Sequence, residues 1–280
     1  MNPWLLGIGL PVLVWWGSTG VVLYLVRQSH RTYGMTVCVA SSLAALAAVG
    51  TWALRDVSGM VGATLGYVCA IALWGWLEIT YLTGRITGPH RMPCDPDRTP
   101  GDRFLRGVMT SLHHELLVIG FGLALWWVHK DAVNQVAAET FLVLWAMRWS
   151  AKLNLFHGVP NLNEEFFPAH LDYLKSYIAK RRWNWLFPIT VGAAMVAFWL
   201  LATAAGASDL EPVLRVQLLM VATTLGLAIV EHWFLVLPIP DQKLWSWAES
   251  RRGRAGEDPA LEHLAAAPLI QPKSTPARQL

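Results

Sequence analysis

Cysteine and charge are both scarce in this chain of 280 residues. The three cysteines, Cys38, Cys69 and Cys94, cannot all pair and form no C-x-x-C motif, which argues against a disulfide framework and a cysteine metal site. Charged residues make up 15% of the sequence and hydrophobic residues 54%, whereas a soluble domain carries roughly 25% charged residues. This composition excludes an ordinary soluble domain and predicts an integral membrane protein.

The sequence also lacks the patterns of two further classes, membrane β-barrels and nucleic-acid-binding proteins. Membrane β-barrels use alternating segments of about 10 residues, and the apolar runs in this chain are far longer, so we expect an all-α membrane bundle. The basic residues follow no pattern that could track a nucleic-acid duplex. No nucleic-acid partner is therefore expected, and membrane lipids are the expected surroundings.

Seven apolar runs are long enough to cross a membrane as helices. A spanning helix needs about 20 residues, because each residue adds about 1.5 Å across a hydrocarbon core of about 30 Å. The first run lacks the basic start and cleavage site of a signal peptide and is interpreted as a retained helix. The sequence predicts one transmembrane domain over 1–240, with spans at 4–26, 35–54, 60–82, 109–128, 136–156, 185–206 and 213–237.

The distribution of lysine and arginine predicts the orientation. Segments 27–34, 83–108, 157–184 and 238–280 hold 2, 5, 4 and 6 of these residues, whereas the opposite loops hold only Arg55 and Lys130. Short cytoplasmic loops keep an excess of basic residues. We therefore expect the N-terminus outside and the C-terminus in the cytoplasm.

Two cytoplasmic segments carry structural expectations of their own. In 163–182, apolar residues recur at helical spacing (Phe167, Leu171, Leu174 and Ile178), which predicts an amphipathic helix lying at the membrane interface. Segment 241–280 is interpreted as a cytoplasmic tail. It is rich in proline and charge from about 250 onward, which predicts disorder there.

Polar residues inside the predicted spans are the best candidates for function. An unpaired charge there costs roughly 2.5–3.5 kcal/mol, so such residues usually have a role. Because neighbouring spans run in opposite directions, nearly all of them fall toward the cytoplasmic side. We predict that they converge as one polar cluster of Glu78, His113, His114, Glu115, Arg148, Lys152, Asn154, His157, Glu231 and His232.

An ion-pair network is the first interpretation of this cluster. Arg148 and Lys152 are four residues apart and share one face of their helix. They offer two positive charges to three carboxylates in the spans. Lys152 is expected to pair with Glu115 or Glu78, and its loss is expected to be the most damaging. Such a network could be purely structural.

Metal or pigment binding is the second interpretation. The candidate ligands for iron or zinc are Glu78, His114, Glu115, His157, Glu231 and His232. Their spacing matches no E-x-x-H or H-E-x-x-H motif, and the nearby cations would repel a dication. A neutral histidine could instead be an axial ligand of a chlorin magnesium or a haem iron, with His113, His114 and His232 as candidates.

Four strings carry a resemblance to a known family. They are WGWLEITYLTGRITGP at 74–89, LHHEL at 112–116, KLNLFHGVPNLNEEFFPAHL at 152–171 and EHWFLVLP at 231–238. Together they resemble the PuhE-type family of photosynthetic complex assembly proteins of purple phototrophic bacteria, over roughly residues 10–250.

The resemblance implies a multi-pass protein of the bacterial inner membrane. Its implied role is to assist assembly of the reaction centre and light-harvesting complex and to influence the supply or insertion of bacteriochlorophyll. The implied partners are subunits of those complexes or other assembly factors, and the implied ligand is bacteriochlorophyll or a precursor. No catalytic residue is carried over. The alternative is a metal-dependent oxidoreductase or hydroxylase acting on a tetrapyrrole or lipid at the same His/Glu cluster.

Overall fold

The computed structural model describes residues 2–161, 168–182, 184–239 and 241–248. Within these ranges the regular structure is helical and contains no strand, apart from an isolated bridge between Val159 and Lys180. The elements are η1 (Leu5–Gly9), α1 (Leu10–Val26), η2 (His30–Thr32), α2 (Tyr33–Leu54), α3 (Met60–Leu82), α4 (Pro100–Met109), α5 (Leu112–His129), α6 (Val136–His157), η4 (Ala169–Tyr177), α7 (Leu186–Ala205), α8 (Pro212–Phe234) and η5 (Asp241–Ala248). The all-α prediction is confirmed.

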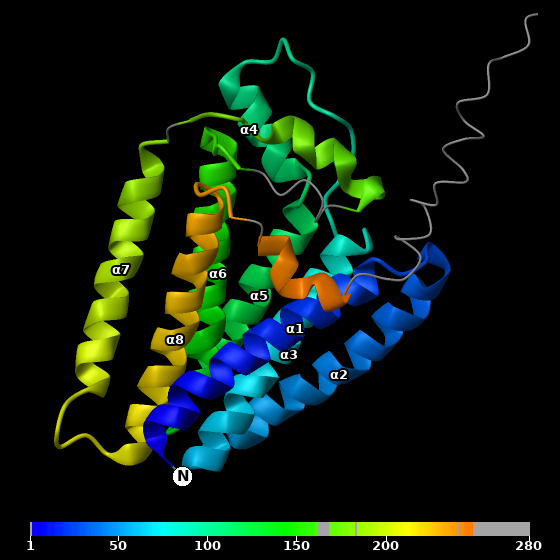
Figure 1. Ribbon diagram of the computed structural model, residues 1–280. Coiled ribbons are helices and arrows are strands. Elements are labelled where there is room, and N and C mark those ends of the chain that lie inside the picture. The colour runs from blue at the N-terminus through cyan, green and yellow to red at the C-terminus, as the bar shows by residue number, and fades with distance from the viewer. Residues whose placement is uncertain (1, 162–167, 183, 240, 249–280) are drawn as a thin grey trace, which may run out of the picture.

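A long helix occupies each of the seven predicted ranges. Five helices are long and apolar enough to cross a membrane, namely η1 with α1, η2 with α2, α3, α7 and α8. The bent pair α4 and α5 is a sixth candidate. Helix α6 has 22 residues and lies among the others (Figure 1), but it contains three charged residues, Glu139, Arg148 and Lys152. The predicted total of seven spans therefore depends on α6.

The helices alternate in direction along the bundle (Figure 1). The connections after α1, α3 and α6 and the end of α8 lie at one end, which we call the basic end, and the N-terminus lies at the other. The described parts of the segments with the excess of lysine and arginine thus begin at one end, as their charge predicts. That this end faces the cytoplasm remains a prediction.

Helix α3 packs against α1, α2, α6 and α8. One buried cluster joins α2, α3, α5 and α6, and a second joins α6, α7 and α8. Many large apolar side chains remain on the outer surface, such as Met35 with 75% of its area exposed and Leu46 with 69%. This is the pattern of a bundle whose outer surface faces hydrocarbon.

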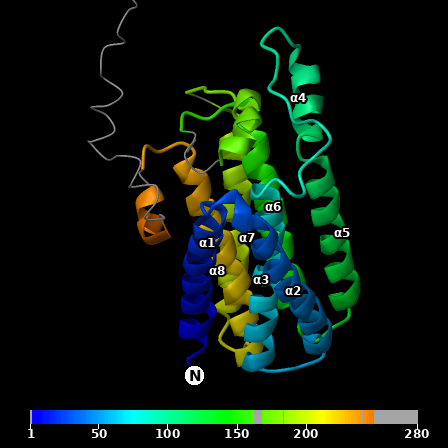
Figure 2. The ribbon, with the colours of Figure 1, turned by 90° about the vertical axis from the view of Figure 1, so that its right-hand side faces the viewer.

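Helix α4 is the element that the sequence analysis missed, since the segment before it is rich in proline and glycine. Thr99 caps it by accepting a hydrogen bond from the Asp102 amide at 3.3 Å, and Pro100 fits the first turn, where no amide partner is needed. The axes of α4 and α5 differ by 64°, and α4 lies beyond the basic end of α5 (Figure 2). The fourth long helix therefore begins at Leu112 rather than at 109.

The segment predicted as an interfacial helix differs from the expectation in length and in packing. It is a 3-10 helix over Ala169–Tyr177, and Leu171 and Leu174 are buried against Tyr81 of α3. The apolar stripe therefore packs on protein. Phe167, the first predicted residue of the stripe, lies outside the described residues.

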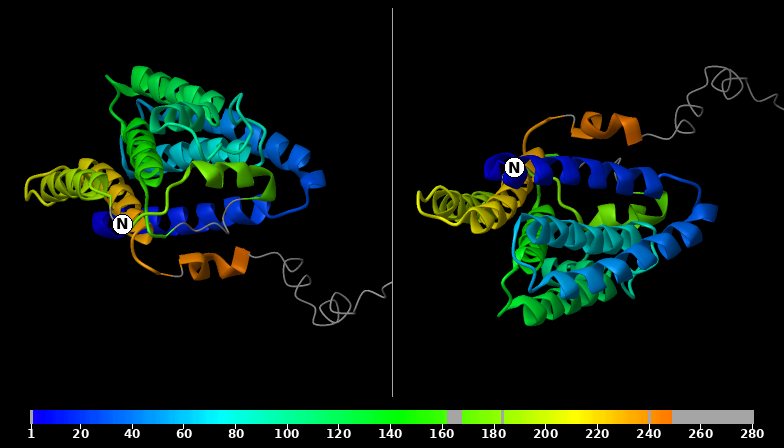
Figure 3. Two further views of the ribbon diagram at one scale, coloured as in Figure 1. Left: turned by 90° about the horizontal axis from the view of Figure 1, so that it is seen from above. Right: turned by 90° about the horizontal axis from the view of Figure 1, so that it is seen from below.

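The start of the predicted tail is also packed on the bundle. Helix η5 lies along α1 on the outside of the other helices (Figure 3). The Trp245 indole donates to the Trp16 carbonyl at 3.0 Å, and the Trp16 indole donates to the Leu244 carbonyl at 3.0 Å. Gly20 leaves room for Trp247, whose ring would lie 2.0 Å from a Cβ at this position. The part predicted to be disordered, from about 250, lies outside the described residues.

Candidate functional site

Four charged side chains meet near the basic end of α3, α5 and α6. Arg148 donates from Nη1 to Glu78 Oε1 at 2.5 Å, and its Nε lies 3.8 Å from Glu115 Oε1. Lys152 pairs with Glu115 and donates to Ser111 Oγ at 2.9 Å. The predicted pairing of Lys152 with Glu115 is present, and Arg148 takes the other carboxylate. We call these four residues the charged cluster.

The break between α4 and α5 puts Glu115 at the N-terminal end of α5. Helix α5 starts at Leu112, so Glu115 lies in its first turn and its amide donates to the Ser111 carbonyl at 2.9 Å. The positive end of a helix dipole stabilises a carboxylate in this position. A continuous helix from 109 would have had no such terminus beside Lys152.

The Tyr81 ring lies against both cations, Arg148 and Lys152. The Arg148 guanidinium carbon is 5.2 Å and the Lys152 nitrogen 5.7 Å from the centre of its ring. The fully buried His114 lies on the same ring, with 4.7 Å between ring centres. Sequence reasoning did not include Tyr81 or Ser111. Tyr81 follows Glu78 by three residues, which places both on one face of α3 and would have signalled its role.

A second polar group occupies the opposite face of α6 and is uncharged. The Asn154 amide donates to the Ser150 carbonyl at 2.9 Å and to Thr190 Oγ1 at 3.0 Å, and accepts from the Asn184 amide at 2.9 Å. His232 bonds through Nε2 to Ser150 Oγ at 2.9 Å and through Nδ1 to the Ala228 carbonyl at 2.8 Å. We call this group of α6, α7 and α8 the neutral joint.

The remaining predicted residues lie apart from the charged cluster. His113 is exposed, and His157 is half-buried with its ring centre 6.3 Å from that of Trp185. Glu231 accepts a hydrogen bond from the Trp15 indole at 2.8 Å. The ten predicted residues thus form a charged cluster, a neutral joint and separate side chains.

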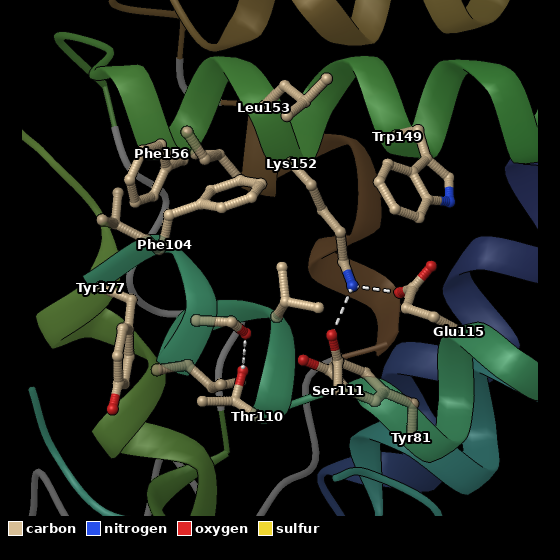
Figure 4. Close-up of a pocket in the computed structure, with 15 residues that line it drawn as sticks. Tyr81, Phe104, Thr110, Ser111, Glu115, Trp149, Lys152, Leu153, Phe156 and Tyr177 are labelled. Carbon is tan, nitrogen blue, oxygen red and sulfur yellow. Dashed lines mark hydrogen bonds and ion pairs between the residues drawn. The ribbon is translucent and has the colours of Figure 1, made fainter. Parts of the chain in front are cut away.

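Two cavities flank the charged cluster. The larger one, of about 390 Å³, lies between α1, α3, α6 and α8 and is lined by Glu78, Arg148, Glu231 and His232 among others. The smaller one, of about 160 Å³, lies between α4, α6 and η4 (Figure 4), and Lys152, Glu115 and Ser111 form its polar part. Charged groups are therefore available to a ligand on both sides of α6.

The wall of the smaller cavity formed by η4 includes a tyrosine. The Tyr177 hydroxyl donates to the Met92 carbonyl at 3.0 Å. Burial raises the pKa of this phenol, so it stays protonated and keeps donating at neutral pH. Tyr177 thus ties η4 to the segment that precedes α4.

The predicted metal-ligand candidates do not form one group. Across the part of the chain that the structure describes, no three histidine, cysteine, aspartate or glutamate side chains gather closely enough to hold a metal ion. The predicted candidates are spread over the charged cluster, the neutral joint and isolated positions.

Comparisons with known proteins identify relatives by sequence only, since no solved structure matches. A relative from Rhodobacter capsulatus, described as "Uncharacterized 30.4 kDa protein in puhA 5′ region", is 35% identical over 253 residues, which cover 88% of this chain and 90% of the relative. Residues 1–255 match the family described as "Protein of unknown function (DUF3623)". The chain therefore belongs to the DUF3623 family.

Proposed function

We propose that this protein is an assembly factor of the bacterial inner membrane for the photosynthetic complex, acting on the supply or insertion of bacteriochlorophyll. The observation that carries the proposal is the relative in the puhA 5′ region, which matches this chain over nearly its full length. The resemblance of four sequence strings to the PuhE-type assembly proteins points to the same role. The proposed partners are subunits of the reaction centre or light-harvesting complex, or other assembly factors.

The architecture supports such a role. Several helices are apolar enough to cross a membrane, and the charged cluster lies near their basic end. Charges within membrane segments are costly and usually mark a functional site. A factor that receives a pigment or a pigment-bearing subunit needs polar groups at membrane depth next to open space. The cavities on either side of α6 supply this combination.

Deletion of the relative's gene in Rhodobacter capsulatus tests the proposal. The near-infrared absorption of isolated membranes reports bacteriochlorophyll bound in the assembled complexes. We expect this absorption to fall in the deletion strain and to recover when the strain expresses this chain. An unchanged spectrum after deletion would overturn the proposal.

A second experiment separates folding from function. The deletion strain receives a double variant, Lys152→Met with Glu115→Leu, in which one ion pair is replaced by apolar side chains. We expect the variant to accumulate as folded protein without restoring the spectrum, because the proposal requires polar groups beside the smaller cavity. Full restoration would show that the pair has only a structural role.

A further inference from the structure

The smaller cavity has walls suited to hydrocarbon. Its apolar lining comes from α4, α6 and η4 and includes Leu174. Phe104 and Phe156 form another part of it (Figure 4). Phe104 has 41% of its area exposed, so the cavity reaches the surface beside α4. Its volume of about 160 Å³ compares with an engineered apolar cavity of about 150 Å³ that holds benzene. It can therefore enclose one end of a long molecule.

Two residues that line this cavity, Glu115 and Trp149, have polar side-chain atoms without a hydrogen-bond partner among the described residues. Glu115 is 5% exposed, and its Oε2 has no hydrogen-bond partner among the described residues. The buried indole Nε1 of Trp149 also lacks a partner there. Two residues that line the cavity thus each carry a buried polar atom without a partner among the described residues, one an acceptor and one a donor, and such atoms are uncommon in folded proteins.

The charge balance restricts what could satisfy them. The two cations and two carboxylates of the charged cluster cancel, so a charged ligand would add an uncompensated charge at low dielectric. A neutral group that both donates and accepts fits the two free atoms, and a hydroxyl is the simplest such group.

We propose that this cavity binds the hydroxyl end of a neutral long-chain alcohol. The hydroxyl donates to Glu115 Oε2 and accepts from Trp149 Nε1, while the first carbons of the chain lie against Phe104 and Phe156. The remainder of the chain leaves past α4. This inference does not depend on the proposed assembly function, since it concerns only what the purified protein binds.

Three photoreactive probes of equal chain length test the ligand class. They are a diazirine-bearing dodecanol, the corresponding carboxylate and the corresponding amine, each irradiated with the purified full-length protein in detergent. We expect the alcohol to label the peptides that contain Phe104 and Phe156 about tenfold more than the other two, because only the alcohol adds no charge. Equal labelling by all three probes, or labelling elsewhere, would overturn the proposal.

Two tryptophans one turn apart on α6 provide a matched pair of variants. Trp149→Phe removes the unused indole donor at the cavity and keeps an aromatic wall. Trp145→Phe removes another buried indole donor that has no partner within the described part of the chain, and Trp145 does not line this cavity. We expect two- to tenfold weaker labelling by the alcohol for Trp149→Phe, which corresponds to one hydrogen bond, and no change for Trp145→Phe. Equal effects of the two variants would contradict the assignment.

Two glycines of α4 provide a second pair. Gly107 lines the cavity, and a Cβ there would be 3.5 Å from the Tyr177 ring, an ordinary contact. Gly101 faces open space. Gly107→Leu should fill the cavity and abolish labelling, whereas Gly101→Leu should leave it unchanged. Labelling that survives in a folded Gly107→Leu protein would place the alcohol elsewhere. If Gly107→Leu does not fold, the tryptophan pair decides.

Discussion

The two polar faces of α6 keep polar groups inside a membrane bundle in different ways. On one face, Arg148 and Lys152 meet the carboxylates of α3 and α5. On the other, Ser150 and Asn154 meet an amide, a hydroxyl and an imidazole from the α7 and α8 side. The two sets are offset by two residues, which is about 200° of helical rotation and places them on opposite faces.

The side chains of Asn154 and His232 in the neutral joint have hydrogen-bond partners, whereas two polar atoms of the charged cluster have none within the described residues. Asn154 uses both its amide nitrogen and its oxygen, and both ring nitrogens of His232 are bonded. In the charged cluster, Glu115 Oε2 and Arg148 Nε lack hydrogen-bond partners within the described residues. A satisfied network gives rigidity, whereas unused polar atoms beside a cavity leave capacity for a ligand. We therefore propose that the neutral joint mainly holds α6, α7 and α8 together and that the charged cluster is the group that meets a ligand.

Removal of Arg148 should have the largest effect on this comparison. Arg148→Met leaves Glu78 without its cation and takes a second cation away from Glu115. We expect the free energy of unfolding to fall by about 3–5 kcal/mol, as when one partner of a buried pair is lost. Thermal unfolding in detergent measures it. The control is Arg55→Met, since Arg55 forms an exposed pair with Asp56. Equal losses in the two variants would refute a special role for Arg148.

Removal of Lys152 should have a somewhat smaller effect. The sequence analysis expected Lys152 to be the most sensitive residue, but Glu115 keeps Arg148 at 3.8 Å when Lys152 is lost. We expect Lys152→Met to cost about 3 kcal/mol, and the added change Glu115→Leu to restore most of it, because the unpaired carboxylate is then gone. The same unfolding assay applies to both variants. If single and double variants lose equal stability, the pair does not exist.

Replacing Asn154 tests the neutral joint. Asn154→Leu keeps similar volume but removes the side-chain hydrogen bonds that Asn154 makes with Asn184 and Thr190. We expect a loss of about 1–3 kcal/mol, the cost of unsatisfied buried polar groups. A double-mutant cycle that combines Asn154→Leu with Asn184→Leu should give a total loss that differs from the sum of the two single losses, since the two side chains share a hydrogen bond. Strictly additive losses would mean that the joint does not act as a unit.

Lowering the pH should have the smallest effect. His170 of η4 bonds through Nε2 to the Leu82 carbonyl at the end of α3. Burial lowers the pKa of His170, and the neighbouring His30 adds to the lowering. The folded state therefore favours the neutral ring, so its stabilising contribution is complete above the ordinary histidine pKa of about 6.5 and declines as the pH falls below it.

The measurement is the difference in Tm between the native protein and His170→Gln. We expect this difference to shrink between pH 8 and pH 5.5. Protonating the His170 ring in the folded state costs free energy, whereas glutamine does not titrate. A difference that grows on acidification would show that the folded state favours the charged ring.

The sequence alone determined the helical class and the approximate limits of the long helices. Runs of about 20 apolar residues have few alternatives to a membrane helix, because unpaired backbone groups are too costly in hydrocarbon. It also placed Glu78, Glu115, Arg148 and Lys152 at one depth, since alternating helices return to the same end. The pairing of Lys152 with Glu115 was one of two options that helical spacing left open.

Only the tertiary structure shows which side chains of different helices lie next to one another. Depth follows from position along a helix, but the direction in which a side chain faces depends on helix rotation and packing, which local patterns do not fix. Asn154 of α6 therefore bonds to Asn184 and Thr190, and His232 of α8 bonds to Ser150 of α6, rather than to the carboxylates. His113 is exposed. The bend before α5 placed Glu115 at a helix terminus and opened the cavity beside Lys152, a result of packing between α4, η4 and α6 that no single segment contains.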